Sequence, residues 1–231
     1  MATGLHRITP LTTLLALLLL TGACGSPEPA PAVEPASRQP VGPDPASPPP
    51  SASASAVASS KVVGQAPADL RNLDWDSVPF PGEFCSVPGL VRFDDRLEAR
   101  GRSRTWGPVR IMRSQQVNYG DFEGDSRVEA AVYVGCDDDG ITQNTQIAAG
   151  YVVFGRAGKN LVVLGSITAQ QESQAAYPTA LVRPEFARGR ITVHEKWYRF
   201  SDAHCCPTGN ATTVWTREGH RLAPGAPRVV S

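Results

Sequence analysis

The sequence lacks the short motifs that mark the commonest enzyme classes. It contains no glycine-rich phosphate loop and no G-x-S-x-G turn that would present a nucleophilic serine. It also contains no C-x-x-C pair and no H-x₃₋₅-H spacing, which are typical of dithiol and zinc sites. Basic and acidic side chains number 22 each, so the formal net charge is zero. Without a basic excess there is no electrostatic basis for binding nucleic acid.

Aromatic residues are missing from the N-terminal part of the chain, where Trp75 is the first. Residues 25–60 instead contain 26 Pro, Ala or Ser residues, ten of them proline. A segment of this composition cannot bury enough apolar surface to offset the conformational entropy that ordering would cost. We therefore expect residues 24–66 to form a disordered, partly polyproline-II linker that reaches on the order of 100 Å.

The first 24 residues have the pattern of an export signal that ends in a lipidation cysteine. Arg7 precedes an apolar run over residues 11–20, and Thr21-Gly22-Ala23-Cys24 follows it. The run has the length of a secretory h-region and is shorter than the about 20 apolar residues of a membrane-spanning helix. The segment resembles a bacterial lipoprotein signal, in which residues 1–23 are removed and Cys24 carries the lipid. We expect a lipid-anchored protein on the extracytoplasmic face of the cell membrane; the alternative is an ordinary cleaved signal that leaves Cys24 as a free thiol.

Beyond the linker the pattern is typical of β-strands. Residues 128–136 are a continuous apolar strand candidate, and residues 190–200 alternate between apolar and polar side chains. Residues 146–154 and 161–168 flank a short glycine-containing loop, which predicts a hairpin. Shorter strand candidates are residues 90–93, 109–117 and 212–216. Residues 67–76 are compatible with one short turn of helix, and residues 170–176 are the one segment with helix-like spacing. We expect residues 67–231 to form a single, mostly β domain, namely an antiparallel sandwich, barrel or curved sheet.

Four cysteines remain after Cys24, namely Cys85, Cys136, Cys205 and Cys206. In an exported protein an even number of cysteines usually indicates disulfides. Because adjacent cysteines rarely reach disulfide geometry, we expect Cys85 and Cys136 each to pair with one member of the adjacent pair. The alternative is a metal or redox site in which His194 and His204 join the cysteines as ligands for copper or zinc.

A cluster of carboxylates lies between two predicted strands. Asp121, Glu123, Asp125 and Glu129 are spaced like the hard oxygen ligands of a calcium loop. The position of Gly124 differs from that of the EF-hand glycine, however, and Arg127 adds a positive charge. The alternative to a calcium site is a tight polar turn.

Three blocks of the sequence resemble blocks in secreted and lipid-anchored actinobacterial proteins. They are residues 117–125 followed by 129–132 and Cys136, residues 191–198 (ITVHEKWY) and residues 205–215 (CCPTGNATTVW). In those relatives the acidic loop is closer to D-x-x-G-D-G, whereas Ser126 stands here in place of the last glycine. The family has no established activity, so the resemblance implies a compartment and a domain extent, and no catalytic residues.

These observations favour a non-enzymatic envelope protein whose β domain binds a ligand or a partner protein, and which contacts the membrane through lipid on Cys24. No catalytic residues are predicted, because the sequence yields no set of convergent titratable groups. His194 and Glu195 are adjacent in a predicted strand, so their side chains face opposite ways. The alternatives are an envelope hydrolase or a metal/redox enzyme of unrecognised type, and a module that is stabilised by calcium as its cofactor.

Overall fold

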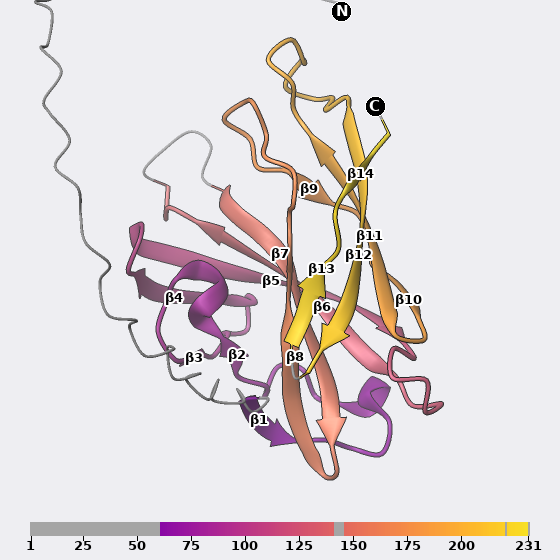
Figure 1. Cartoon of the computed structure of the whole chain (residues 1–231). Helices are drawn as coiled ribbons and strands as arrows, with labels where there is room; N and C mark the ends of the chain where they lie inside the picture. The colour runs from indigo at the N-terminus through magenta and orange to yellow at the C-terminus, as the bar shows by residue number, and fades with distance from the viewer. Residues whose placement is uncertain (1–60, 141–145, 220, 231) are drawn as a thin grey trace, which may run out of the picture. The chain divides into compact units, whose positions relative to one another are not determined.

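The computed structural model describes residues 61–140, 146–219 and 221–230 (Figure 1). Within these residues the helical elements are two short 3₁₀ turns, so the predicted mostly β class is confirmed. The predicted signal peptide, Cys24 and most of the linker lie outside the described residues. In chain order the elements are β1 (Lys61–Gln65), η1 (Leu70–Asn72), β2 (Phe80–Pro81), η2 (Gly82–Cys85), β3 (Leu90–Val91), β4 (Glu98–Ser103), β5 (Gly107–Gly120), β6 (Glu129–Asp137), β7 (Gln146–Ala157), β8 (Asn160–Thr168), β9 (Ala180–Leu181), β10 (Glu185–Ala187), β11 (Arg190–Trp197), β12 (Gly209–Glu218), β13 (Arg221–Pro224) and β14 (Arg228–Val229).

The strands form two main antiparallel sheets and one small one. The first sheet has the order β1-β8-β7-β6-β5-β4. The second has the order β10-β11-β12-β13, with β9 paired to β11 and β14 paired to β12. The sheet of β2 and β3 has two strands. Figure 1 shows the second sheet, in orange and yellow, beside the long strands β7 and β8 of the first. Because all pairs are antiparallel, short hairpin connections suffice and no crossover helices are needed.

Strand β6 is central in the first sheet and is buried on both faces. On one face, Val132 and Val134 belong to a core formed with the N-terminal segment, which contributes Leu70, Trp75 and Phe80. On the other face, Ala131 belongs to a core shared with the second sheet, which contributes Ile191, Val193 and Trp215. Burial on both faces explains why residues 128–136 are almost continuously apolar instead of alternating. Each large side chain buried here contributes roughly 1.5–3 kcal/mol.

The predicted hairpin is confirmed, since β7 and β8 pair around a turn at Gly158 and Lys159. The short helical turn expected within residues 67–76 is present as the 3₁₀ turn η1, whereas the helix-like spacing at 170–176 forms no helix. Strand β1 pairs with β8 and buries Val63, so folded structure extends to Lys61, within the segment expected to be linker. No helix among the described residues is long and apolar enough to cross a membrane.

Candidate functional site

An open cleft of about 580 Å³ lies where one end of the first sheet meets the loop between β8 and β9. The start of β7 and the end of β8 line it with Ala148, Ala149 and Thr168. Further lining comes from Phe84, Trp106 and the loop at 169–179. The volume lies within the range of about 300–1,000 Å³ that small-molecule sites occupy.

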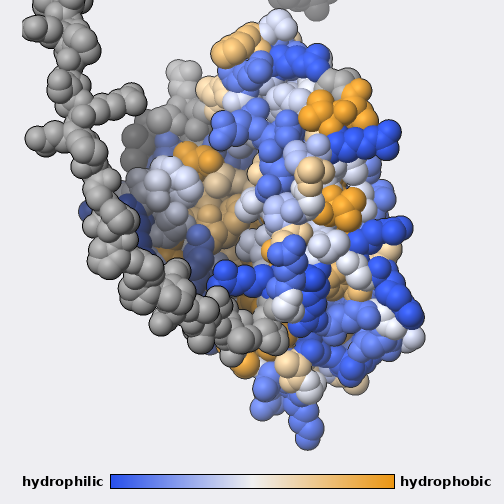
Figure 2. Space-filling view, viewed as in Figure 1, coloured by the Kyte–Doolittle hydropathy of each residue, from blue (hydrophilic) through white to orange (hydrophobic). Residues whose placement is uncertain are grey.

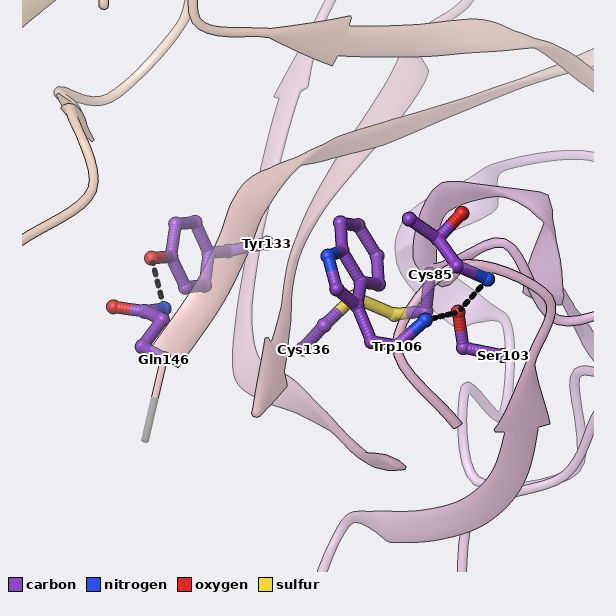
Figure 3. The surroundings of a disulfide bond; sticks show 7 residues. Cys85, Ser103, Trp106, Tyr133, Cys136 and Gln146 are labelled. Carbon is purple, nitrogen blue, oxygen red and sulfur yellow. Dashed lines mark hydrogen bonds between the residues drawn. A yellow bond between two sulfur atoms is a disulfide. The ribbon is translucent and has the colours of Figure 1, made fainter. Parts of the chain in front are cut away.

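Phe84 and Trp106 are fixed by a disulfide and by a turn. Cys136 lies near the C-terminal end of β6, and its bond to Cys85 attaches η2, which carries Phe84, to that end of the strand. Trp106 is in the turn between β4 and β5, where Ser103 Oγ accepts the N–H of Trp106 and of its predecessor, each at 3.1 Å. Figure 3 shows the indole among the surroundings of the Cys85–Cys136 disulfide. Trp106 is 39% exposed, so its ring is accessible to a ligand.

The Phe84 ring also depends on a glycine beneath it. A Cβ at Gly150 of β7 would lie 2.6 Å from Phe84 Cε2, far inside van der Waals contact. Glycine at this position therefore allows the ring to lie directly against the strand.

The loop at 169–179 is fixed from beneath by Glu195, a residue of β11 that is 1% exposed. Glu195 Oε2 accepts the backbone N–H of Gln170 at 2.8 Å and of Gln171 at 2.9 Å. Its Oε1 accepts the hydroxyl of Thr213 at 2.6 Å. The Thr179 hydroxyl donates to the Gln171 carbonyl at 2.7 Å, which closes the loop. A loop ordered in this way loses little entropy when a ligand binds.

Three rings, Tyr177, Tyr198 and His204, hold the other end of the same loop. The Tyr177 ring centroid lies 5.1 Å from that of Tyr198 and 5.2 Å from that of His204. The Tyr198 hydroxyl donates to the His204 carbonyl at 2.9 Å, and the Gln174 N–H donates to the Tyr198 carbonyl at 2.8 Å. Tyr177 itself lines the cleft, so this aromatic cluster positions part of the cleft wall.

The polar groups of the cleft are almost all neutral. Gln146 and Gln171 present amides, Thr168 and Ser173 present hydroxyls, and Glu172 contributes a carboxylate. Gln146 is oriented by a hydrogen bond from its Nε2 to the Tyr133 hydroxyl at 3.2 Å, drawn in Figure 3. No Lys, Arg or His is among the described residues that line the cleft. An anionic ligand would therefore lose hydration without gaining a cationic partner.

The cysteines form disulfides as expected, but with a different connectivity. Cys85 pairs with Cys136, with a Cα–Cα distance of 5.8 Å, and Cys205 pairs with Cys206. The prediction that Cys85 and Cys136 each pair with one member of the adjacent pair is therefore wrong. The physical reason is that Cys85 and Cys136 are both buried in one core, whereas Cys205 and Cys206 are exposed in the turn between β11 and β12.

The carboxylates of the predicted calcium loop are engaged by the protein itself. Asp121 accepts the backbone N–H groups of Gly124, Asp125 and Ser126, at 2.5, 3.1 and 2.9 Å. Glu129 is buried, and its Oε2 accepts the N–H of Phe122 at 2.7 Å and that of Glu123 at 3.1 Å. These contacts describe a tight polar turn in which both carboxylates already accept backbone N–H groups.

The other two acidic side chains of this loop are paired with arginines. Glu123 pairs with Arg217 of β12, and Asp125 Oδ2 accepts the Arg127 Nε–H at 2.7 Å. The Arg127 guanidinium lowers the pKa of Asp125 from its ordinary value. Burial raises the pKa of Glu129, although its two backbone donors act in the opposite direction. Within the described part of the chain, no group of three or more His, Cys, Asp or Glu side chains is arranged to hold a metal ion.

His194 and Glu195 face opposite ways, as their adjacency in a strand predicts. Glu195 points into the core, while His194 is exposed, with Nδ1 3.0 Å from Thr212 Oγ1 and Nε2 3.9 Å from Glu185 Oε1. A hydroxyl, an imidazole and a carboxylate thus lie in a row, but none of the three lines the cleft. The row lies on the face of β11 and its neighbours opposite to the one that packs into the core.

Sequence reasoning missed the cleft and the part played by Glu195. The sequence did contain one signal for Glu195. This residue shares its strand face with Ile191, Val193 and Trp197, so the alternation places a carboxylate at a core position. A buried carboxylate requires donors, which here come from the cleft loop. The cleft itself joins residues 84, 106, 146–149 and 168–179, whose proximity no local pattern indicates.

No known family model, curated protein or solved structure matches this chain. The resemblance to secreted and lipid-anchored actinobacterial proteins therefore stays a prediction.

Proposed function

We propose that the β domain is a non-enzymatic binding module and that its cleft takes a neutral saccharide. The observation that carries this proposal is the lining of the cleft, whose described residues combine Phe84, Trp106 and Tyr177 with amide and hydroxyl side chains and include no cation. Sugar rings have apolar C–H faces that stack on aromatic rings. Their hydroxyls both donate and accept hydrogen bonds, as do the amides of Gln146 and Gln171.

The same lining favours binding over hydrolysis. Glycosidases use a pair of carboxylates that flank the bond to be cleaved. Among the described lining residues Glu172 is the single carboxylate, and no histidine accompanies it. A bound saccharide would thus meet aromatic faces and amides without the pair of groups that acid–base cleavage requires.

A small ligand in the cleft is better supported than docking of a partner protein on an apolar face. In the view of Figure 2, hydrophilic residues dominate the surface and apolar residues form small, separate patches. Large exposed hydrophobic residues, such as Val182 and Phe200, are scattered along the chain. Scattered residues of this kind are normal for a soluble surface and do not indicate an interface.

The proposal includes a lipid on Cys24 that places the module on the extracytoplasmic face of the cell membrane. It is supported by the apolar run and small residues before Cys24 and by the Pro/Ala/Ser-rich segment after it. Mass spectrometry of the N-terminal peptide from expressing cells tests it. We expect the chain to begin at acylated Cys24, and an unmodified Cys24 thiol would contradict the anchor.

Calorimetric titration of the full chain tests saccharide binding. The probes are the neutral tetrasaccharides of N-acetylglucosamine, glucose (β-1,4 and α-1,4) and xylose, with tetragalacturonate as the anionic comparator. We expect at least one neutral probe to bind and tetragalacturonate not to bind. Binding of tetragalacturonate alone, or of no probe, contradicts the proposal.

Two variants locate the site. Trp106→Ala removes the exposed ring of the cleft, and burying such a ring against a ligand is worth roughly 1.5–3 kcal/mol, so affinity should fall about ten- to a hundredfold. Phe200→Ala is the matched control, because Phe200 is 85% exposed and lies outside the cleft lining. Equal effects of the two substitutions would place binding elsewhere on the protein.

A further inference from the structure

The two disulfides differ sharply in their access to solvent. Cys85 is 1% exposed and Cys136 is 0% exposed, and both belong to the core. Cys205 and Cys206 are both exposed, in the turn between β11 and β12. Because thiol–disulfide exchange requires a thiolate to reach a sulfur atom, an external thiol has access to Cys205 and Cys206 alone.

Reduction of the Cys205–Cys206 bond leaves the surrounding fold intact. The two residues are adjacent, so their bond closes no loop of chain. The turn is organised separately by Asp202, whose Oδ2 accepts the N–H of Arg199 at 2.8 Å and of Thr208 at 2.9 Å. The Cys206 N–H also donates to the Ala203 carbonyl at 2.9 Å. A change in the bond therefore acts locally, on residues 203–206.

The same turn contacts the wall of the cleft. His204, which precedes Cys205, packs its ring on Tyr177 with a centroid distance of 5.2 Å, and its carbonyl accepts the Tyr198 hydroxyl. Tyr177 lines the cleft. The eight-membered ring formed by adjacent bonded cysteines restricts the backbone next to His204. The state of the bond and the position of Tyr177 are therefore linked through one side chain.

We propose that Cys205–Cys206 is a thiol-exchange site for small dithiols and that its reduction weakens ligand binding in the cleft. One thiolate of the dithiol attacks Sγ of one cysteine, forming a mixed disulfide and releasing the other cysteine as a thiolate. The second thiol of the reagent then displaces the first cysteine. The reagent ends as its own cyclic disulfide and has supplied two electrons and two protons, which leave Cys205 and Cys206 as thiols. The second half of the proposal rests on the saccharide function; the first half does not.

Selective reduction tests the first half. The full chain is treated with dithiothreitol under native conditions, alkylated with iodoacetamide and mapped by peptide mass spectrometry. We expect Cys205 and Cys206 to become alkylated at least about tenfold faster than Cys85 and Cys136, because the buried pair is reached only through unfolding. Alkylation of all four cysteines at one rate, or of Cys85 and Cys136 first, overturns the proposal.

Titration with the bound neutral tetrasaccharide, before and after selective reduction, tests the second half. An aromatic contact such as His204–Tyr177 is worth a factor of about two to ten, so we expect affinity to fall by that factor. The Cys205→Ser/Cys206→Ser variant should bind the saccharide with the affinity of the reduced protein, and dithiothreitol should not change that affinity. His204→Ala should also bind more weakly, with the same affinity in both redox states. Equal affinity of oxidised and reduced wild-type protein overturns the coupling.

The coupling has a readout that needs no ligand. The Gln174 N–H donates to the Tyr198 carbonyl, so its hydrogen exchange reports on the cleft end of the aromatic cluster. We expect exchange at residues 174–177 to become faster on reduction in wild-type protein and to be independent of redox state in His204→Ala. If no saccharide binds, the proposed function fails while this measurement still decides the coupling. Unchanged exchange on reduction overturns it.

Discussion

Glu195 offers the sharpest test of how the cleft is built. Its carboxylate is 1% exposed and accepts two backbone N–H groups of the cleft loop and one core hydroxyl. Glu195→Ala removes all three acceptor contacts at once. A buried donor left without an acceptor costs about 1–3 kcal/mol, which applies in full to the Thr213 hydroxyl. Because the N–H groups of Gln170 and Gln171 are only part-buried and water can partly satisfy them, each is expected near the lower end of that range, so the substitution should lower the free energy of unfolding by about 3–6 kcal/mol. Typical domains have about 5–15 kcal/mol in total, so the variant would be close to unfolding.

Glu195→Gln separates the loop contact from the loss of a side chain. Its amide oxygen still accepts N–H groups of the loop, and its NH₂ donates to the Thr213 hydroxyl, which rotates to accept. We expect a cost of only about 1–2 kcal/mol. Glu172→Gln is the control from the same loop, because Glu172 is exposed; its effect should stay within about 0.5 kcal/mol.

Urea unfolding and hydrogen exchange together measure these effects. Unfolding gives the global free energy, and exchange at Gln170 and Gln171 reports whether the loop opens locally. We expect faster exchange at both amides in Glu195→Ala, with the Gln variant intermediate. If Glu195→Ala changed stability by less than about 1 kcal/mol and left both amides protected, Glu195 would not organise the loop.

Three further predictions concern the rest of the domain. Cys85→Ala/Cys136→Ala should lower the free energy of unfolding by about 4 kcal/mol in the chain-entropy model, because the bond joins residues 51 apart. Cys205→Ser/Cys206→Ser should lower it by less than about 1 kcal/mol. Urea unfolding midpoints measure both losses, and equal losses would contradict the pairing. Millimolar calcium should leave the thermal unfolding midpoint unchanged, because Asp121 and Glu129 already accept backbone N–H groups. A rise of the midpoint with calcium would instead support a calcium site in this loop. Burial raises the pKa of Glu129 above its ordinary 4.5, so the contribution of its protonated carboxyl to stability is fully present below pH 4.5 and is lost as the pH rises through the raised pKa. Glu129→Gln should therefore flatten the plot of unfolding free energy against pH in that range, and an unchanged slope would refute the raised pKa of Glu129.

The sequence predicted the fold class because its signals are local. The apolar run at 128–136 became β6, and the glycine-containing loop after 146–154 became the β7–β8 hairpin. Alternation in residues 190–200 predicted that Ile191 and Val193 face away from His194, and in β11 the first two are buried while His194 is exposed. Each of these inferences uses side-chain periodicity or turn chemistry within a few residues.

The cleft and the disulfide pairing depend on contacts that sequence order does not encode. Phe84 reaches the cleft because Cys85 is bonded to Cys136 and because Gly150 leaves room for its ring, whereas Trp106 reaches it from the β4–β5 turn that Ser103 organises. The expectation for the cysteines used only the geometry of adjacent residues. It could not include the burial of Cys85 and Cys136 in one core, which comes from folding the N-terminal segment onto the first sheet.

Nuclear magnetic resonance of the full chain, titrated with the neutral tetrasaccharides, tests the central claim most directly. The chain has four tryptophans, so the indole N–H of Trp106 can be assigned through Trp106→Ala. We predict that a neutral saccharide shifts the Trp106 indole signal and the side-chain amide signals of Gln146 and Gln171, and leaves the other indole signals in place. Shifts confined to β11–β14, or no shift with any neutral probe, would contradict the cleft as the binding site.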